Sequence, residues 1–192
     1  MVNTQAEGDV SVRRVDARRN YDRIVNVATT VLAEDPKATL QDIAVAAGLH
    51  RATLHRHFRS REELLSVLRA RSAERMLAAL DTVEAADVPT VDRMPLFTLL
   101  VLENAVPTGL WRFTTYYGTG MDEHMEEMVR RIVAILEESR QAGALHTDLS
   151  SEQLRAIWYG VVYGVLPLID AGTMTMDEGV GLVMAALRPS AA

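Results

Sequence analysis

The sequence has no cysteine, which excludes disulfides, thiolate metal sites and cysteine nucleophiles. It also lacks any run of 18 or more uncharged apolar residues, so no transmembrane helix is expected. The first twenty residues contain Asp, Glu and several Arg, where a signal peptide would need an apolar stretch. These absences predict a cytoplasmic protein.

Common catalytic signatures are missing as well. There is no G-x-S-x-G nucleophile elbow, no Walker-type phosphate loop and no H-E-x-x-H zinc motif. His55 and His57 are two residues apart, so on a helix they would point to different faces. We therefore predict no enzymatic activity, no metal site and no cofactor.

What the sequence does have is an uneven distribution of charge. With 192 residues, 48% of them hydrophobic, the chain is long enough for a small head on a larger body. The net charge is −6, yet residues 1–71 hold 12 Lys or Arg against 9 Asp or Glu, whereas residues 72–192 hold 8 against 17. A basic head attracts phosphate and an acidic body repels it, so a contact with nucleic acid is expected at the N-terminal end.

The pattern of residues 39–65 predicts two short helices joined by a tight turn and followed directly by a third helix. Thr39 is a good N-cap, and Asp42, three residues later, can complete a capping box. Gly48 supplies the positive φ that the corner of a helix-turn-helix needs.

The second of these helices, residues 50–57, has a distinctive outer face. From Leu49 to Arg61 there are four arginines and three histidines but no carboxylate. Such a helix suits the major groove of DNA, where arginine binds guanine edges or phosphates and threonine binds phosphate or a thymine methyl. A solvated basic face is the alternative interpretation, and the glycine corner favours DNA.

This stretch resembles the DNA-binding domain of the TetR family of transcriptional repressors. The resemblance is carried by Thr39, Asp42-Ile43-Ala44, Ala47-Gly48-Leu49, Ala52-Thr53-Leu54, His57-Phe58, Ser60 and Glu62. The family commonly has Ser at the position of His50 and Tyr at the position of His55. An imidazole at His55 can still donate to phosphate, but the contact becomes sensitive to pH.

The expected DNA contacts combine groove chemistry with this resemblance. The predicted DNA-binding residues are Arg51, Thr53 and Arg56 in the groove, Thr39, His55, His57 and Arg61 on phosphates, and His50 and Ala52 beside them.

The rest of the chain is helical in pattern, without a period-2 strand. A helix is expected from about Asp16 to Ala33, and a long helix starting at Ser60 is expected to join head and body without a flexible linker. We predict an all-α fold of about nine helices. Its parts are a flexible basic arm (residues 1–15), a three-helix helix-turn-helix DNA-binding head (16–66) and a C-terminal helical bundle for effector binding and dimerisation (67–192).

Aromatic residues and methionines gather in the body. Together they suit an adaptable apolar pocket, although ordinary core packing is the alternative for any one of them. The predicted ligand-binding residues are Phe97, Trp111, Phe113, Tyr116, Tyr117, Met121, His124, Met125, Met128, Trp158 and Tyr163.

Residues 151–171 form a helix that is apolar nearly all round and must be covered on every side. Few helices remain to cover it, so a second copy of the chain is the expected partner. We predict a homodimer through this helix and the last one, forming a four-helix bundle, as the TetR resemblance also implies. The predicted interface residues are Gly160, Val161, Gly164, Val165, Val180, Met184 and Leu187.

These features predict a ligand-responsive transcriptional regulator. It would be a repressor released from a palindromic double-stranded DNA operator by a small, largely apolar effector. The alternative is a helical dimeric protein-interaction module without specific DNA binding, and loss of salt-sensitive duplex binding would favour it.

Overall fold

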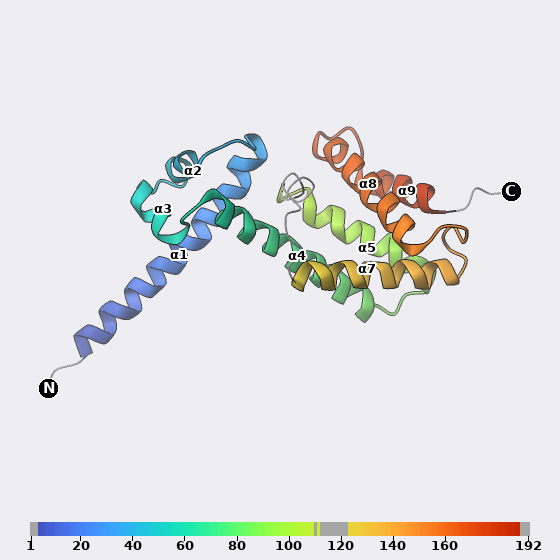
Figure 1. Cartoon of the computed structure of the whole chain (residues 1–192), viewed down its shortest axis with the longest axis horizontal. Coiled ribbons are helices and arrows are strands. Elements are labelled where there is room, and N and C mark those ends of the chain that lie inside the picture. Colours follow the sequence, from blue (N-terminus) through green and yellow to red (C-terminus); the bar gives the residue numbers. More distant parts are fainter. Residues whose placement is uncertain (1–3, 110, 112–122, 189–192) are drawn as a thin grey trace. The chain divides into compact units, whose positions relative to one another are not determined.

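The computed structural model describes residues 4–109, 111 and 123–188, with side chains from Val15 onward (Figure 1). These residues contain helices and no strand, which confirms the predicted all-α fold. The helices are α1 (Thr4–Glu34), α2 (Leu40–Ala46), α3 (Arg51–His57), α4 (Arg61–Ala85), α5 (Thr90–Ala105), α7 (Glu123–Gln141), α8 (Ser151–Asp170) and α9 (Met176–Leu187). Over this part of the chain, no helix is long and apolar enough to cross a membrane.

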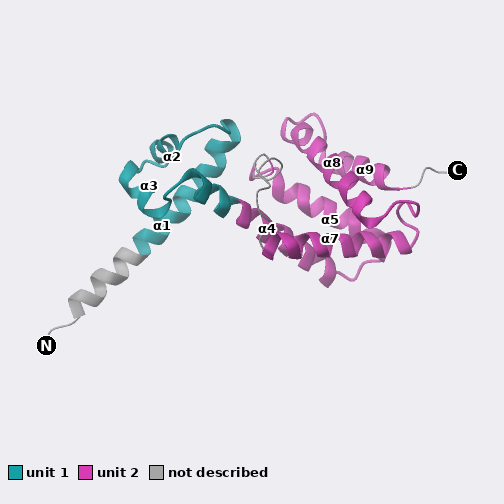
Figure 2. Ribbon diagram, in the orientation of Figure 1, with its two compact units in different colours: residues 1–68 teal, residues 69–192 magenta. Residues whose placement is uncertain are grey.

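The chain divides into two compact units, residues 1–68 and 69–192 (Figure 2). Helix α4 contributes its first residues to unit 1 and the rest to unit 2.

Helix α1 begins earlier than the sequence predicted. It starts at Thr4, so the expected start near Asp16 was wrong, and residues 4–15 of the predicted arm lie within this helix. The prediction followed apolar periodicity, which is absent before Asp16. No proline interrupts residues 4–34, and hydrogen bonding can continue along a helix beyond its last buried side chain.

Unit 1 is built on a small apolar core that α1 to α4 share. Ile43 of α2 and Leu54 of α3 are fully buried, and Phe58 follows Leu54 at a spacing of one helical turn. The ring of Phe58 stacks on Tyr21 of α1, with ring centres 5.3 Å apart. This packing fixes which face of α3 points outward.

Unit 2 is centred on Trp158 of α8. Helix α5 packs against α7, α8 and α9, and α8 also packs against α7 and α9. The Trp158 ring stacks on Phe97 at 5.3 Å, and its indole N–H donates to the hydroxyl of Thr98 over 3.0 Å. Thr98 in turn donates to the Met94 carbonyl over 2.8 Å, so the buried polar atoms of this cluster are paired.

Candidate nucleic-acid interface and body pocket

The corner between α2 and α3 has the geometry that its residues predict. The Thr39 hydroxyl accepts from the backbone N–H of Asp42, and the Asp42 carboxylate accepts from the backbone N–H of Thr39, which completes the predicted capping box. Gly48 has φ +62°, as predicted. The N–H of Gly48 donates to Val45 and that of Leu49 to Ala44, the paired bonds of a Schellman C-cap.

Asp42 also accepts a hydrogen bond from the Thr39 hydroxyl, over 2.7 Å. This bond, followed by the bond from the Thr39 backbone, lowers the pKa of Asp42. The Thr39 hydroxyl proton is therefore already donated within unit 1, although the side chain remains exposed.

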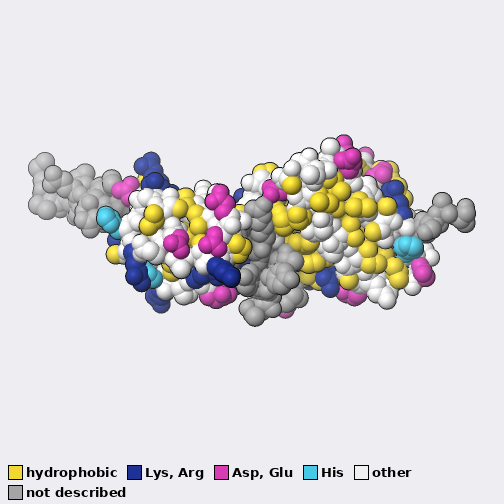
Figure 3. Space-filling view, turned by 90° about the horizontal axis from the view of Figure 1, so that it is seen from above, with side chains coloured by type: hydrophobic (Ala, Val, Ile, Leu, Met, Phe, Trp, Pro, Cys, Tyr) yellow, Lys and Arg dark blue, Asp and Glu magenta, His cyan; other side chains and the backbone are white. Residues whose placement is uncertain are grey.

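Helix α3 presents most of its predicted DNA-binding residues outward. Arg51, Ala52 and Arg56 are exposed, and Thr53 and His55 are half-buried. His50, also exposed, is the N-cap residue and makes no side-chain capping bond. Figure 3 shows basic side chains on the surface of unit 1.

Two of the predicted contact residues are bonded to each other. The Arg51 Nε–H donates to Nε2 of His55 over 3.3 Å, one turn further along α3. Because Nε2 accepts this bond, a hydrogen bond from His55 to phosphate would come from Nδ1.

His57 lies on a different side of α3, as its spacing from His55 required. Its ring meets Tyr21 of α1 edge-on, with centres 6.4 Å apart, and its Nε2 is buried without a hydrogen-bond partner among the described residues. Burial, with a smaller effect from the charge of Arg56, lowers the pKa of His57. This residue is better placed to pack α3 onto α1 than to bind the phosphate assigned to it by sequence.

The Arg61 side chain is also hydrogen-bonded within unit 1. Its guanidinium donates to the backbone carbonyls of Pro36 and Ala38, which lie in the turn between α1 and α2. These bonds use two of the five N–H donors of the guanidinium and fix its orientation, so the phosphate contact predicted for Arg61 would be limited to the other three.

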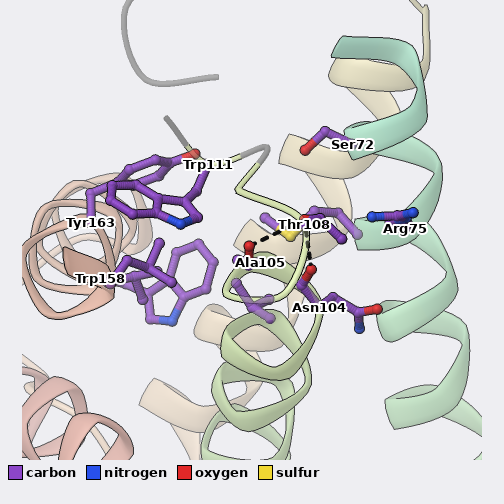
Figure 4. Close-up of a pocket in the computed structure, with 12 residues that line it drawn as sticks. Ser72, Arg75, Asn104, Ala105, Thr108, Trp111, Trp158 and Tyr163 are labelled. Carbon is purple, nitrogen blue, oxygen red and sulfur yellow. Dashed lines mark hydrogen bonds between the residues drawn. The ribbon is translucent and has the colours of Figure 1, made fainter. Parts of the chain in front are cut away.

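Unit 2 contains a small hollow between α4, α5 and α8, with a volume of about 40 Å³ (Figure 4). Three residues of the predicted ligand set line it, namely Trp111, Trp158 and Tyr163. The sequence reasoning missed the remaining lining residues, which are Ser72, Arg75, Met76, Val101, Asn104, Ala105, Thr108, Val162 and Leu166.

The other described members of the predicted ligand set lie outside the hollow. Phe97 is buried behind Trp158 and does not line the hollow. His124 is exposed on α7, and Met125 and Met128 of the same helix are half-buried outside the lining. Phe113, Tyr116, Tyr117 and Met121 lie outside the described residues.

The predicted dimer face is divided by the structure into an inner and an outer half. Val165, Met184 and Leu187 are buried in the core of a single chain, so they are not available to a partner. The outer side of α8 and α9 carries Gly160, Gly164, Leu168, Gly181 and Leu182, all exposed, with Val161 and Val180 half-buried. Apolar side chains cover much of unit 2 in Figure 3.

The match to known proteins is strongest over the helix-turn-helix. Residues 24–68 match the family model described as "Bacterial regulatory proteins, tetR family". Residues 24–68 therefore form a TetR-type DNA-binding domain. Members of this family are DNA-binding transcriptional regulators and not enzymes, in agreement with the sequence predictions.

Two curated relatives are helix-turn-helix regulators by name. The chain is 24% identical to the HTH-type transcriptional regulator NfxB of Pseudomonas aeruginosa over 152 residues, covering 76% of this chain and 80% of that protein. It is 38% identical to the HTH-type transcriptional repressor LfrR of Mycolicibacterium smegmatis over 66 residues, covering 34% of this chain and 35% of that protein.

Solved structures of TetR-family proteins share the fold. PfmR from Thermus thermophilus superposes with a TM-score of 0.71 at 17% identity, covering 88% of this chain and 100% of that one. LfrR from Mycobacterium smegmatis, solved in complex with proflavine, gives a TM-score of 0.66 at 22% identity, covering 88% and 94% of the two chains.

Proposed function

We propose that this TetR-family chain is a homodimeric repressor that leaves its operator when a small effector occupies the hollow in unit 2. The observation that carries operator binding is the outer face of α3. It exposes Arg51 and Arg56 and holds no carboxylate, so cationic groups meet the DNA without competition from acids on the same helix.

Roles on the DNA follow from exposure and bonding. Arg51, Thr53 and Arg56 would reach base edges or phosphates in the major groove, with Ala52 allowing close approach of the backbone. His55 would bind phosphate. Thr39, whose hydroxyl and backbone N–H both donate to Asp42, would fix the start of α2 and not donate to phosphate itself. Arg61 and His57 would hold α3 in place instead of contacting DNA.

The outer face of α8 and α9 supports dimerisation. Leu168 is 43% exposed and Leu182 is 48% exposed, and a methyl group added at Gly160, Gly164 or Gly181 would meet no neighbouring atom within the chain. A second copy would bury these positions in a four-helix bundle. Two α3 helices would then fit major grooves one turn apart, roughly 34–36 Å, and the operator would be nearly palindromic.

Effector release would act through α4. Ser72, Arg75 and Met76 line the hollow, and Arg61, which holds the turn before α2, belongs to the same helix. An effector can change operator affinity only through different affinities for two arrangements of the protein. Coupling of about 1–3 kcal/mol, or roughly 5–150-fold, is typical.

Selection from random duplex DNA with the full chain would identify the operator, and fluorescence anisotropy would then give its affinity. We expect Arg51→Ala and Arg56→Ala each to lose about 1–3 kcal/mol of operator binding. The control Arg155→Ala, on α8, should bind normally. Duplex binding that is weak and unchanged between about 50 and 200 mM salt would overturn the proposal and favour the protein-interaction alternative.

A further inference from the structure

The lining of the hollow in unit 2 has two chemically different sides (Figure 4). Aromatic side chains from α8 and from Trp111 form one side, and α4 supplies Ser72 and Arg75 opposite them. We infer that the effector is a planar aromatic acid, whose ring packs on the aromatic side and whose anionic group faces Arg75. This inference rests on the proposed function, since it names the ligand of that same site.

The aromatic side is a rigid surface. Trp158 is held by stacking on Phe97 at 5.3 Å and by its hydrogen bond to Thr98, so its ring does not need to be ordered by a ligand. Tyr163 lies one helical turn and one residue further along α8 and lines the same hollow. Flat, fixed rings favour a flat ligand, because offset stacking adds affinity beyond the area that it buries.

The polar side is cationic. Arg75 is the one charged side chain among the lining residues that the structure describes, and these include no carboxylate. Other arginines of unit 2 are paired with acids: Arg93 with Glu138, and Arg131 with Asp81 and Glu84. Within the described part of the chain, by contrast, no salt bridge involves Arg75. Its guanidinium is therefore available to an acidic ligand.

Hydrogen bonding around Arg75 also suits an anion. The Asn104 side-chain amide donates to the Leu100 carbonyl over 2.7 Å, and this leaves its second N–H for a ligand. The Ser72 hydroxyl lies on the α4 side of the hollow. A carboxylate accepts from all three groups, whereas an ammonium ion would face the Arg75 charge without a counter-ion.

The volume of the hollow limits how an aromatic ring could enter it. The hollow measures about 40 Å³, less than the roughly 150 Å³ of an engineered cavity that holds benzene. A ring must therefore displace a side chain, and Met76, which is half-buried in the lining, is unbranched and can change rotamer at little cost.

The test uses three ligands with the same ring, 2-naphthoate, 2-naphthamide and 2-naphthylmethylammonium, titrated calorimetrically into the full chain. We expect the carboxylate to bind at least about tenfold more tightly than the other two. Arg75→Gln should lower the affinity for 2-naphthoate to that for 2-naphthamide and leave the affinity for 2-naphthamide unchanged. Arg75→Lys should restore part of the preference, and Arg155→Gln should have no effect.

Three results would overturn the assignment: tightest binding of the ammonium compound, a carboxylate preference that survives in Arg75→Gln, or no binding of any of the three. Thermal melts of each variant show whether it is folded. Operator binding is measured separately without ligand. A chain that binds operator but none of the naphthalenes refutes only the aromatic-acid assignment, and a chain that binds 2-naphthoate but no operator refutes only the repressor proposal.

Discussion

The Nε–H of Arg61 donates a hydrogen bond to the backbone carbonyl of Ala38, 3.1 Å away. The donor is at the start of α4 and the acceptor is just before α2, so one side chain joins the two segments that flank the α2–α3 pair. We therefore assign Arg61 a structural role, which is to hold the segment before α2 against the start of α4.

Arg61→Ala should therefore destabilise unit 1 by about 1–3 kcal/mol, the usual cost of losing hydrogen bonds to a charged group. Urea unfolding would measure the loss. Arg51→Ala, which removes an exposed side chain, is the matched control and should leave stability nearly unchanged. If Arg61→Ala kept wild-type stability and reduced the salt slope of DNA binding by about one, Arg61 would be a phosphate-contacting residue after all.

Gly48→Ala should cost about 1–2 kcal/mol, because an alanine at φ +62° has its Cβ too close to the following carbonyl. The new methyl would also approach Arg23, whose guanidinium nitrogen lies 3.2 Å from the position of the added atom. Comparing unfolding of Gly48→Ala in the wild-type and Arg23→Ala backgrounds separates the two causes. If Arg23→Ala removed the whole loss, crowding and not backbone conformation would be responsible.

Stability of unit 1 should fall in mild acid because of His57. Burial and the charge of Arg56 lower its pKa, so the unfolded chain takes up the proton more readily than the folded one. The contribution is complete above the unfolded pKa, about 6.5, and is lost as pH falls through the lowered folded pKa. Melting followed from about pH 7.5 to 5 should show a smaller decrease for His57→Gln than for wild type. The same decrease in both would contradict the assignment.

Leu182→Glu should convert the proposed dimer to monomers by placing a charge on the outer face of α9. Light scattering coupled to gel filtration would report the mass. Val91→Glu is the matched control, since Val91 is also an exposed apolar residue, 43% accessible, but lies on α5. A dimer that tolerates Leu182→Glu would mean that the proposed face is not the interface.

Local structure was the part of this fold most accessible from sequence. The capping box that begins at Thr39 forms as its residue spacing predicts, and Gly48 adopts positive φ at the end of α2. Each of these features depends on residues within a few positions of one another, so sequence contains the information needed.

Features that depend on packing could not be obtained in this way. Helix α8 is apolar on nearly every side, so periodicity could not tell Val165, which is buried in the chain, from Val161 and Gly164, which face outward. The polar side of the hollow was missed for the same reason. Ser72 and Arg75 look like ordinary surface residues of a long helix, and only packing shows what they face.

Gly179 lies on the inner side of α9, where an added Cβ would come within 2.8 Å of the Ile169 side chain and 3.3 Å of that of Leu102. An added methyl group there would displace the terminal methyls of these two side chains, and a large side chain would push α9 outward. The same helix carries Leu182 on its solvent side. A bulky substitution in the interior of a subunit would thus be transmitted to the surface by which two subunits are proposed to recognise each other. Variants at Gly179 should weaken assembly without altering any residue that a partner touches.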